Sequence, residues 1–596
     1  MRTSTAIILL IVISMILTSC HQQRPDHLKI RIIETSDIHG ALFPVDFLNK
    51  EQPIPSLAHI SAFVNRQRRD QSRQLILLDN GDMLQGDPSV YYSNFIDTTH
   101  RHISADIYNY MKYDAVCIGN HDIEPGHAVY DKMVSEMTMP MLGANVLRQS
   151  DLRPYFQPYE IFMREGVKIA VLGLTTPAIP QWLPETIWEG MLFEDMIESA
   201  KKWIKILEEE EHPDLIIGLF HAGVDYTYNG QDEHTYKNEN ASQLVAEQVP
   251  GFDIILVGHD HAGWNKTVLN KENQEVLILG PTSRAYDIAI ADVEFFYNAQ
   301  KDRYEKEISG MIVSMEEEKP DTTYMEKFAP FQQKVSQFVA MPVGSFATSI
   351  DSRPSLFEPS PFTDIIHLLQ FELTGAAISF TSPLNLNTRI AQGEVQMRDL
   401  FKLYRFENLL YTMKLSGEEI KKYLEFSYGN WFDTMYDREG NLMRYQRDSL
   451  GHIRINPKNR RPMMFGQYFN YSSAAGIRYT VDISKPIGER ITIRCLSNEE
   501  PFDPNKYYTV AINSYRGNGG GGHLLRGSEI PEKELPSRVI QSTEKDLRFY
   551  LAQYIKAHSP VKIPPVAQWS VIPEELVKEG KAKDIQMLFG NSYYQK

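Results

Sequence analysis

The sequence predicts an α/β fold for the first half of the chain and a mixed α+β fold for the second half. Between residues 28 and 310, short apolar runs alternate with helix-compatible stretches, which is typical of α/β architecture. From 341 to 560 the pattern is mixed and includes a glycine run at 519–522. We therefore expect two large domains, 28–310 and 341–560. A charged helical linker over 311–340 joins them, and a C-terminal tail follows over 561–596.

The composition excludes several classes of protein. The chain has 596 residues, and 61 Lys and Arg against 77 Asp and Glu give a net charge of −16. Binding of a nucleic acid polymer needs positive charge, so we expect no such partner. A mean hydropathy of −0.35 excludes a protein with many membrane spans. Three cysteines are too few for a disulfide scaffold. No feature of the sequence predicts a protein partner.

The first residues predict an export signal and a lipid anchor. One arginine precedes an apolar run from Ala6 to Leu17, which is shorter than the ~20 residues of a membrane span and suits a signal peptide. The run ends in LTSC, which resembles a bacterial lipobox. We expect cleavage after residue 19, a lipid on Cys20 and a polar tether over 20–27. This predicts an extracytoplasmic protein anchored to a bacterial membrane; the alternative is an ordinary secretory signal.

Five apolar runs of the first half each end in oxygen or imidazole side chains, mostly beside a glycine. In open α/β sheets, ligands gather outside the carboxyl ends of strands, so five such ends can converge on one pocket. Each motif alone is weak, but five in order are not expected from a core with incidental polar ends. The runs are LKIRIIETS before Asp37 and His39, QLILLDN before Asp82, DAVCI before Asn120, His121 and Asp122, DLIIGLF before His221, and DIILV before His259 and His261.

These residue types suit a pair of divalent metal ions. Aspartate, asparagine and histidine are ligands for zinc, manganese or similar ions. Two such ions ~3.5–4 Å apart clamp a phosphoryl group and lower the pKa of a bound water. One carboxylate must then bridge both ions. The sequence therefore predicts metal-assisted hydrolysis of a phosphoester.

The five motifs together resemble the calcineurin-like metallophosphoesterase family. Its pattern is D-x-H, G-D, G-N-H-[DE], H and G-H-x-H, and all five parts are present in order. The resemblance implies a β-sandwich flanked by helices with a two-metal site. It implies that Asp37, His39 and His261 hold the first ion, that Asn120, His221 and His259 hold the second, and that Asp82 bridges them. It further implies that His121 assists the leaving group and that Asp122 orients His121.

The second half resembles the C-terminal, nucleotide-binding domain of the 5′-nucleotidase family. The matching stretches are DLFKLYRFENLLYTMKLSGEEI, FNYSSAAGIRYTVDIS and YYTVAINSYRGNGGGGH. The resemblance implies that two aromatic rings, here Phe406 and Tyr515, sandwich the nucleobase, which stacking accommodates because every base has a π-face. The alternative is that both rings are core residues.

The branch of the family to which the chain is assigned is inferred from a segment where its sequence differs from the 5′-nucleotidase pattern. The 5′-nucleotidase branch has an N-G-G-G-I-R segment, where this chain has SPLNLNTRI. This feature and the glycine run resemble the 2′,3′-cyclic-nucleotide 2′-phosphodiesterase/3′-nucleotidase branch instead. Arg389, Asn513 and Arg516 are the further candidates for contacts with the nucleotide substrate.

Three alternatives remain open on the sequence. One is a 5′-nucleotidase or UDP-sugar hydrolase. A second is a non-catalytic lipoprotein that binds nucleosides, which the complete metal set disfavours. The third is a related enzyme that releases sulfate from thiosulfate carriers, which the aromatic pair disfavours.

Overall fold

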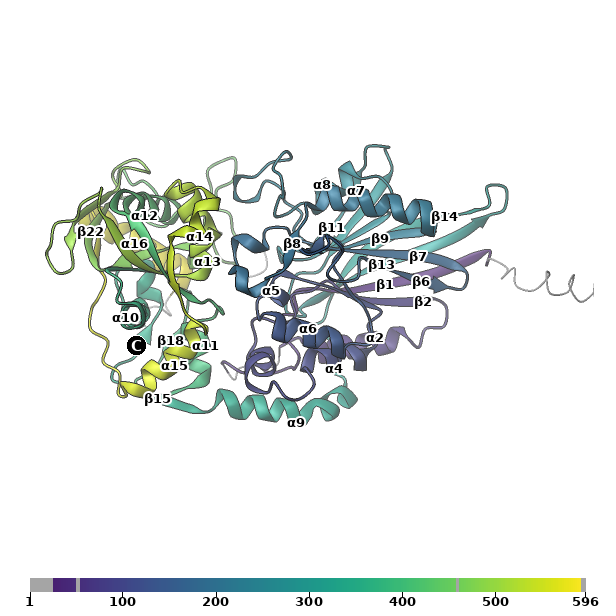
Figure 1. The fold of residues 1–596 in the computed structure, drawn as a ribbon, viewed down its shortest axis with the longest axis horizontal. Helices are drawn as coiled ribbons and strands as arrows, with labels where there is room; N and C mark the ends of the chain where they lie inside the picture. Colours follow the sequence, from purple (N-terminus) through teal and green to yellow (C-terminus); the bar gives the residue numbers. More distant parts are fainter. Residues whose placement is uncertain (1–24, 50–53, 457–459, 591–596) are drawn as a thin grey trace, which may run out of the picture. The chain divides into compact units, whose positions relative to one another are not determined.

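The computed structural model describes residues 25–49, 54–456 and 460–590 (Figure 1). The predicted signal peptide, Cys20 and the tether up to residue 24 lie outside this part of the chain. Within the described residues, no helix has both the length and the apolar character needed to cross a membrane.

The chain forms two compact units that divide within helix α9 (Thr322–Val339), between Ala329 and Pro330. Two short segments of the first half, 46–49 and Ile179–Ile187, group with unit 2. The linker expected over 311–340 is therefore only partly a linker. Its first four residues end a strand of unit 1, and its helix is shared by the two units.

Unit 1 is a sandwich of two six-stranded sheets, as the sequence predicted. The first sheet has the order β14 (Arg303–Ser314), β13 (Asp287–Asn298), β1 (His27–Thr35), β2 (Gln74–Asp79), β3 (Ala115–Cys117) and β4 (Met141–Leu142). The second has the order β11 (Trp264–Leu269), β12 (Glu275–Gly280), β10 (Ile254–Val257), β9 (Leu215–His221), β7 (Val167–Thr175) and β6 (Tyr159–Arg164). Strands β5 (Val146–Arg148) and β8 (Met191–Phe193) form a separate pair.

The strand directions bring the predicted motifs to one end of the sandwich. Strands β1, β2 and β3 are mutually parallel in the first sheet, and β7, β9 and β10 are parallel in the second. The two sheets share an apolar core to which Ile32, Leu78 and Leu219 contribute, all without measurable exposure. The carboxyl ends of five strands therefore border a common region.

Helices cover both outer faces of this sandwich (Figure 1). Buried residues of α7 (Met196–Ile206) and α8 (Ser242–Gln248) share a core with the outer face of the second sheet. Helices on the side of the first sheet are α2 (Leu57–Gln67), α4 (Ile103–Met111) and α6 (His127–Glu136), and the short α3 (Pro88–Tyr91) and α5 (Asn120–Ile123) follow strand ends.

Unit 2 is the α+β domain that the sequence predicted. Its sheets are β21 (Ser473–Ala475), β17 (Ile378–Thr381), β24 (Tyr507–Asn513), β20 (Leu410–Ser416) and β25 (Val539–Ser542); β23 (Ile491–Leu496), β22 (Ile477–Asp482) and β26 (Gln568–Ile572); and the pairs β15 (Pro342–Phe346) with β19 (Gly393–Gln396) and β16 (Ile350–Asp351) with β18 (Arg389–Ile390). Its further helices are α10 (Pro361–Thr374), α11 (Met397–Leu403), α12 (Gly417–Trp431), α13 (Ser514–Gly517), α14 (Leu535–Arg538), α15 (Leu547–Ala557) and α16 (Glu574–Phe589).

The segment expected to be a C-terminal tail is part of the unit 2 core. Strand β26 pairs in parallel with β22 along its whole length. Trp569 on β26 is 6% exposed and its ring centre lies 5.8 Å from that of the fully buried Trp431. The segment folds into unit 2 because its alternate residues are apolar and complete a sheet.

Candidate active site

Six of the seven predicted metal ligands gather in unit 1 as two groups of three, and the seventh, Asn120, adjoins the second group. Each group of three contributes one ligand atom per residue, and these atoms lie within 4.8 Å of one another. The first group comes from the ends of β1 and β10, and the second from the ends of β2, β9 and β10. The groups are Asp37, His39 and His261, and Asp82, His221 and His259.

The first group presents one carboxylate oxygen and two imidazole nitrogens. Oδ1 of Asp37 lies 3.1 Å from Nε2 of His261 and 4.0 Å from Nε2 of His39. The two imidazole nitrogens are 3.1 Å apart. Ligand atoms of a tetrahedral zinc ion, each ~2.1 Å from the metal, lie roughly 3.4 Å from one another. The group therefore has the size of a metal site.

The second group includes Asn120, which lies at the start of α5. Its Oδ1 lies 2.9 Å from Nδ1 of His259 and 3.1 Å from Nε2 of His221. Oδ2 of Asp82 lies 3.1 Å from the same His221 nitrogen. Four potential donor atoms thus converge from the ends of four strands, β2, β3, β9 and β10, as expected from the sequence for the second ion.

The hydrogen bonds on the far side of the rings set which nitrogen faces each group. Nδ1–H of His39 donates to the carbonyl of Gln85 at 3.0 Å, and Nδ1–H of His221 donates to the carbonyl of Asn80. Each bond turns Nε2 toward its group. A backbone carbonyl on the second ring nitrogen is a typical partner of metal-binding histidine, so these residues fit divalent ions.

The backbone at the site is strained in a way that supports a functional role. Of the seven predicted ligands, five have positive φ angles between 49° and 74°, a region that side-chain-bearing residues rarely adopt. Such outliers cluster at active sites, where the surrounding fold enforces them. The five are Asp37, His39, Asp82, His259 and His261.

Two glycines are required because the carboxylates of Asp82 and Asp37 lie close to their backbones. A Cβ on Gly119 would overlap the carboxylate of Asp82, and a Cβ on Gly258 would overlap Oγ of Ser36 and approach the carboxylate of Asp37. The glycines that precede two of the motifs therefore leave room for the ligands themselves.

The ionisation states of the ligands match those of metal ligands only at some positions: burial would lower the pKa of His221, but Asp82 raises it to about 10, so metal binding there displaces a proton. Burial alone would raise the pKa of Asp37, but the neighbouring His261 and His221 lower it to about 2. Burial and His261 lower the pKa of His39 to about 3. An ionised carboxylate and a neutral imidazole are the forms that coordinate a metal.

His121 lies beside the first group, but its ring partner differs from the one expected. The ring centres of His121 and His39 are 5.4 Å apart. Nδ1 of His121 lies 2.5 Å from Oε2 of Glu124, one helical turn further along. Burial would lower the pKa of His121, but Asp82 and Glu124 raise it to about 9. The expectation that Asp122 orients this ring is wrong.

Asp122 instead supports the loop that carries Asp82. Its two carboxylate oxygens accept hydrogen bonds from four backbone N–H groups, at 2.8 to 3.0 Å. In turn, the backbone N–H of His121 donates to Oδ1 of Asp82 at 2.8 Å. The buried Asp122 therefore fixes the carboxylate of Asp82, which is predicted to bridge the two ions. The four donors belong to Asp82, Met83, Leu84 and Gly119.

The segments with the two predicted base-stacking rings lie side by side in unit 2. Strands β20 and β24 pair Leu410 with Asn513, and Ser514 N–H donates to the carbonyl of Leu409 at 2.8 Å. Phe406 and Tyr515 flank this pairing and are both partly exposed. A third ring was not predicted: Phe469 packs edge-to-face on Phe406, with their ring centres 5.6 Å apart. Phe469 begins one of the stretches that resemble the family, so the sequence offered a signal for it.

The polar residues around these rings have different roles from those expected. Arg516 is 3% exposed, and its guanidinium donates to the carbonyl of Gly520 and to Oδ1 of Asn470. Arg516 therefore links the segment that carries Phe469 to the glycine run. Asn513 caps α13 by accepting the N–H of Arg516 at 2.9 Å. Arg389 is exposed on β18.

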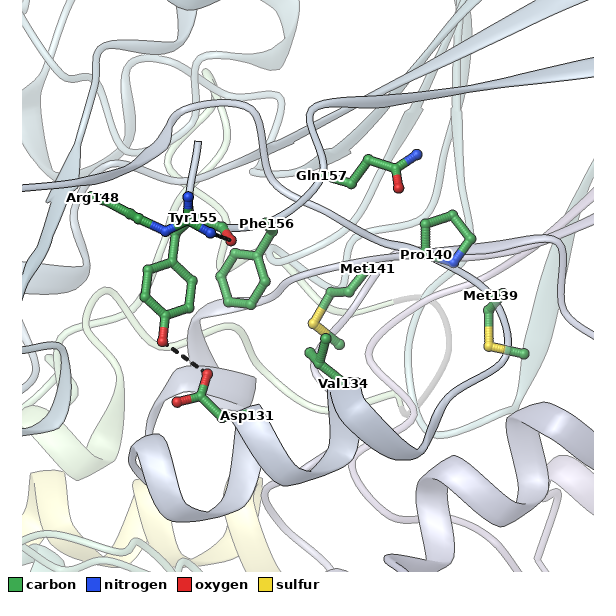
Figure 2. A pocket seen from close by; sticks show the side chains of 9 residues that line it. All are labelled: Asp131, Val134, Met139, Pro140, Met141, Arg148, Tyr155, Phe156 and Gln157. Carbon is green, nitrogen blue, oxygen red and sulfur yellow. Dashed lines mark hydrogen bonds between the residues drawn. The ribbon is translucent and has the colours of Figure 1, made fainter. Parts of the chain in front are cut away.

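A separate surface pocket of about 410 Å³ lies in unit 1 between α6 and the β4–β5 region. Figure 2 shows Tyr155 at one side, where its hydroxyl donates to Asp131 at 2.8 Å. None of the predicted site residues lines this pocket. Its lining residues are Asp131, Val134, Met139, Pro140, Met141, Arg148, Tyr155, Phe156 and Gln157.

Two family models match the chain in the same order as the units. The model described as calcineurin-like phosphoesterase matches residues 30–263. The model described as 5′-nucleotidase, C-terminal domain, matches residues 339–526. The matches cover the strand ends of unit 1 and the aromatic segments of unit 2.

Curated relatives and a solved structure agree with these matches. The chain is 24% identical to the trifunctional nucleotide phosphoesterase protein YfkN of Bacillus subtilis over 91% of its own length, but it spans only 39% of that protein. It is 23% identical to a 2′,3′-cyclic-nucleotide 2′-phosphodiesterase/3′-nucleotidase of Haemophilus influenzae, covering 89% of this chain and 85% of the relative. A putative 5′-nucleotidase from Staphylococcus aureus has the same fold, with a TM-score of 0.74, 22% identity and coverage of 91% of this chain and 99% of that one.

Proposed function

The chain belongs to the 5′-nucleotidase family, in which a calcineurin-like phosphoesterase domain precedes a 5′-nucleotidase C-terminal domain, and we propose that its substrates are 2′,3′-cyclic nucleotides and 3′-nucleotides. It is a metal-dependent phosphoester hydrolase that acts on nucleotides. The observation that carries the proposal is the convergence of two metal-ligand groups on strand ends, with His121 beside them.

The metal ions, when bound, lower the pKa of a water molecule and neutralise the phosphate. His121 holds a proton for the departing ribose oxygen, and Glu124 keeps the ring in place through Nδ1. Hydrolysis of a 2′,3′-cyclic nucleotide opens the ring to a 3′-nucleotide. A second hydrolysis then releases nucleoside and phosphate.

The aromatic region of unit 2 supports a nucleoside as the organic part of the substrate. Phe406, Phe469 and Tyr515 offer partly exposed rings on neighbouring segments, and base stacking on such rings contributes ~1–3 kcal/mol per base. The cyclic and 3′-nucleotide preference is supported by the missing N-G-G-G-I-R segment and by the activity for which the Haemophilus influenzae relative is named.

The alternative within the enzymes is a 5′-nucleotidase or UDP-sugar hydrolase, which the name of the C-terminal family model favours. The non-catalytic nucleoside-binding lipoprotein is disfavoured because six of the predicted ligands form two groups that could each hold a metal ion. Zinc and manganese are the candidate ions, since the mixed nitrogen and oxygen ligands suit both.

The proposed location is outside the cytoplasm, on a lipid attached to Cys20. The support is the apolar run that ends in LTSC. Expression of the full chain with a Cys20→Ser change should release the protein from the membrane fraction. Retention of the variant in that fraction contradicts the anchor.

The proposed specificity is tested with a substrate panel. Residues 21–596 are purified, loaded with manganese or zinc, and assayed on 2′,3′-cAMP, 3′-AMP, 5′-AMP and bis(p-nitrophenyl) phosphate. We expect the highest kcat/KM on 2′,3′-cAMP and 3′-AMP. Activity on 5′-AMP alone selects the 5′-nucleotidase alternative, and no hydrolysis of any compound contradicts the enzyme.

A further inference from the structure

One histidine of the second metal group is held differently from the others. His259 turns Nδ1, not Nε2, toward the group, where it lies 2.9 Å from Oδ1 of Asn120. Its Nε2 lies 3.3 Å from Oε1 of Glu239. The side chains of His259 and Glu239 are each 13% exposed, so water screens this contact only weakly.

The surroundings of Glu239 hold both its backbone and its carboxylate, since Nδ2–H of Asn229 donates to Oε2 of Glu239 at 3.4 Å. Glu239 lies in the segment between β9 and α8, and its backbone N–H donates to Oε1 of Gln231 at 3.1 Å. Its carbonyl accepts the hydroxyl of Thr176 at 3.0 Å, and Thr176 immediately follows β7. Both backbone groups of Glu239 are thus bonded to the surrounding chain, which limits the directions its side chain can take.

The contact between His259 and Glu239 differs in charge from the corresponding contacts of His39 and His221. His39 and His221 donate to backbone carbonyls, which are neutral. His259 donates from Nε2 to a carboxylate, so Nδ1 keeps its lone pair for the metal. A carboxylate acceptor both fixes the tautomer and strengthens the imidazole as a ligand, and the loss of such partners typically weakens metal affinity 10- to 100-fold.

We propose that Glu239 is a positioning residue that sets the affinity of the second metal position through His259, while leaving the first position unchanged. This proposal rests on the two-metal site of the proposed function. It is independent of which nucleotide is the substrate.

The backbone of His259 explains why the effect stays local. Its N–H donates to the Asp37 carboxylate of the first group at 3.0 and 3.2 Å. This contact is a main-chain bond that a change at Glu239 leaves in place. Among the described residues, the side chains of the first position's ligands bond to Ser36, to Gln85 and to one another, and none of these bonds involves Glu239.

The test measures metal binding directly. Residues 21–596 are stripped of metal and titrated with Co²⁺, with calorimetry and the visible absorption of the bound ion as readouts. In Glu239→Gln the amide oxygen still accepts the Nε2–H but the charge is lost, so we expect one of two sites to weaken about 10-fold. In Glu239→Ala both the acceptor and the charge are lost, and the same site should weaken about 100-fold.

Glu233→Gln is the matched control, because it removes the same charge from the same loop at a residue whose side chain is 60% exposed. It should leave both sites unchanged. Unaltered affinities in both Glu239 variants overturn the proposal, and so does equal weakening of both sites. Thermal unfolding of the metal-free variants, matched to the unchanged chain, excludes a general loss of fold as the cause.

The outcomes separate this proposal from the proposed function. If the unchanged chain binds two ions but hydrolyses no nucleotide, and the Glu239 variants weaken one site, the proposed function fails and the role of Glu239 stands. If it hydrolyses nucleotides and the Glu239 variants bind two ions with unchanged affinity, only the role of Glu239 fails. Binding of fewer than two ions by the unchanged chain overturns both.

Discussion

Replacement of Glu124 by glutamine separates the two acidic residues that follow His121. Glu124 is 8% exposed at its side chain and lies 2.5 Å from Nδ1 of His121. Asp122 makes its four hydrogen bonds to backbone N–H groups instead. Glu124→Gln therefore removes the charge that supports the ring while leaving the metal ligands in place.

The size of the effect follows from the kind of hydrogen bond that is lost. Hydrogen bonds to charged groups contribute about 1.5–3 kcal/mol. If that support is present when the leaving oxygen departs, its loss lowers kcat by roughly 10- to 150-fold, at about 1.4 kcal/mol for each tenfold change. KM should change little, because the stacking rings are in unit 2.

The assay compares two leaving groups. Ribose alkoxide is a strong base and needs a proton as it leaves, whereas p-nitrophenolate is a much weaker base and departs unaided. Glu124→Gln should therefore lower kcat on 3′-AMP far more than on a nitrophenyl ester. The contrasting variant is Asp122→Asn, which acts through the bridging Asp82 and should lower both rates together.

Two results refute this reasoning. One is an equal loss on both substrates with Glu124→Gln, which indicates general damage to the site. The other is a rate on 3′-AMP that does not change, which means that the contact between His121 and Glu124 has no part in catalysis.

Further predictions concern the base, the bridging ligand and the stability of unit 2. Tyr515→Ala should raise KM for nucleotides roughly 5- to 150-fold, as expected for loss of ~1–3 kcal/mol of stacking, with little change for nitrophenyl esters. Gly119→Ala places a methyl group against the Asp82 carboxylate, so the protein should lose metal and activity on every substrate. Burial raises the pKa of Asp584 to about 6, so its contribution to stability is complete below pH ~4 and is lost as the pH rises through 6, by about 3 kcal/mol. Asp584→Asn should flatten that dependence in urea unfolding.

Each of these predictions has a result that contradicts it. Equal changes in KM for nucleotides and nitrophenyl esters reject the stacking role of Tyr515. Full metal content in Gly119→Ala rejects the steric argument. Parallel stability curves for Asp584→Asn and the unchanged chain between pH 4 and 7, followed by tryptophan fluorescence, show that Asp584 is not the titrating group.

The sequence predicts the metal site well because each ligand follows a strand. Apolar runs before Asp82 and His221 identify strands β2 and β9, and parallel strands bring their ends together. The two-sheet architecture and the α+β second domain follow from the same patterns and from the family resemblance. The metal-site positions depend on local sequence or on the carboxyl ends of strands in the two sheets of unit 1.

Partners that depend on loops are harder to predict. Glu239 contacts His259 only because the segment between β9 and α8 folds back across the site. The contact between His121 and Glu124 could have been predicted from the sequence, because residues three positions apart are neighbours on a helix. The period-two pattern QWSVI also identifies β26, so the supposed tail was predictable as a strand.

The most direct test of the account is a time course of 2′,3′-cAMP hydrolysis by the metal-loaded mature chain, with products separated by chromatography. We predict that 3′-AMP appears first and then declines as adenosine and phosphate accumulate. A chelator should stop both hydrolysis steps until a divalent ion is restored. Hydrolysis that continues in a chelator, or the absence of any 3′-AMP and adenosine from 2′,3′-cAMP, contradicts the account.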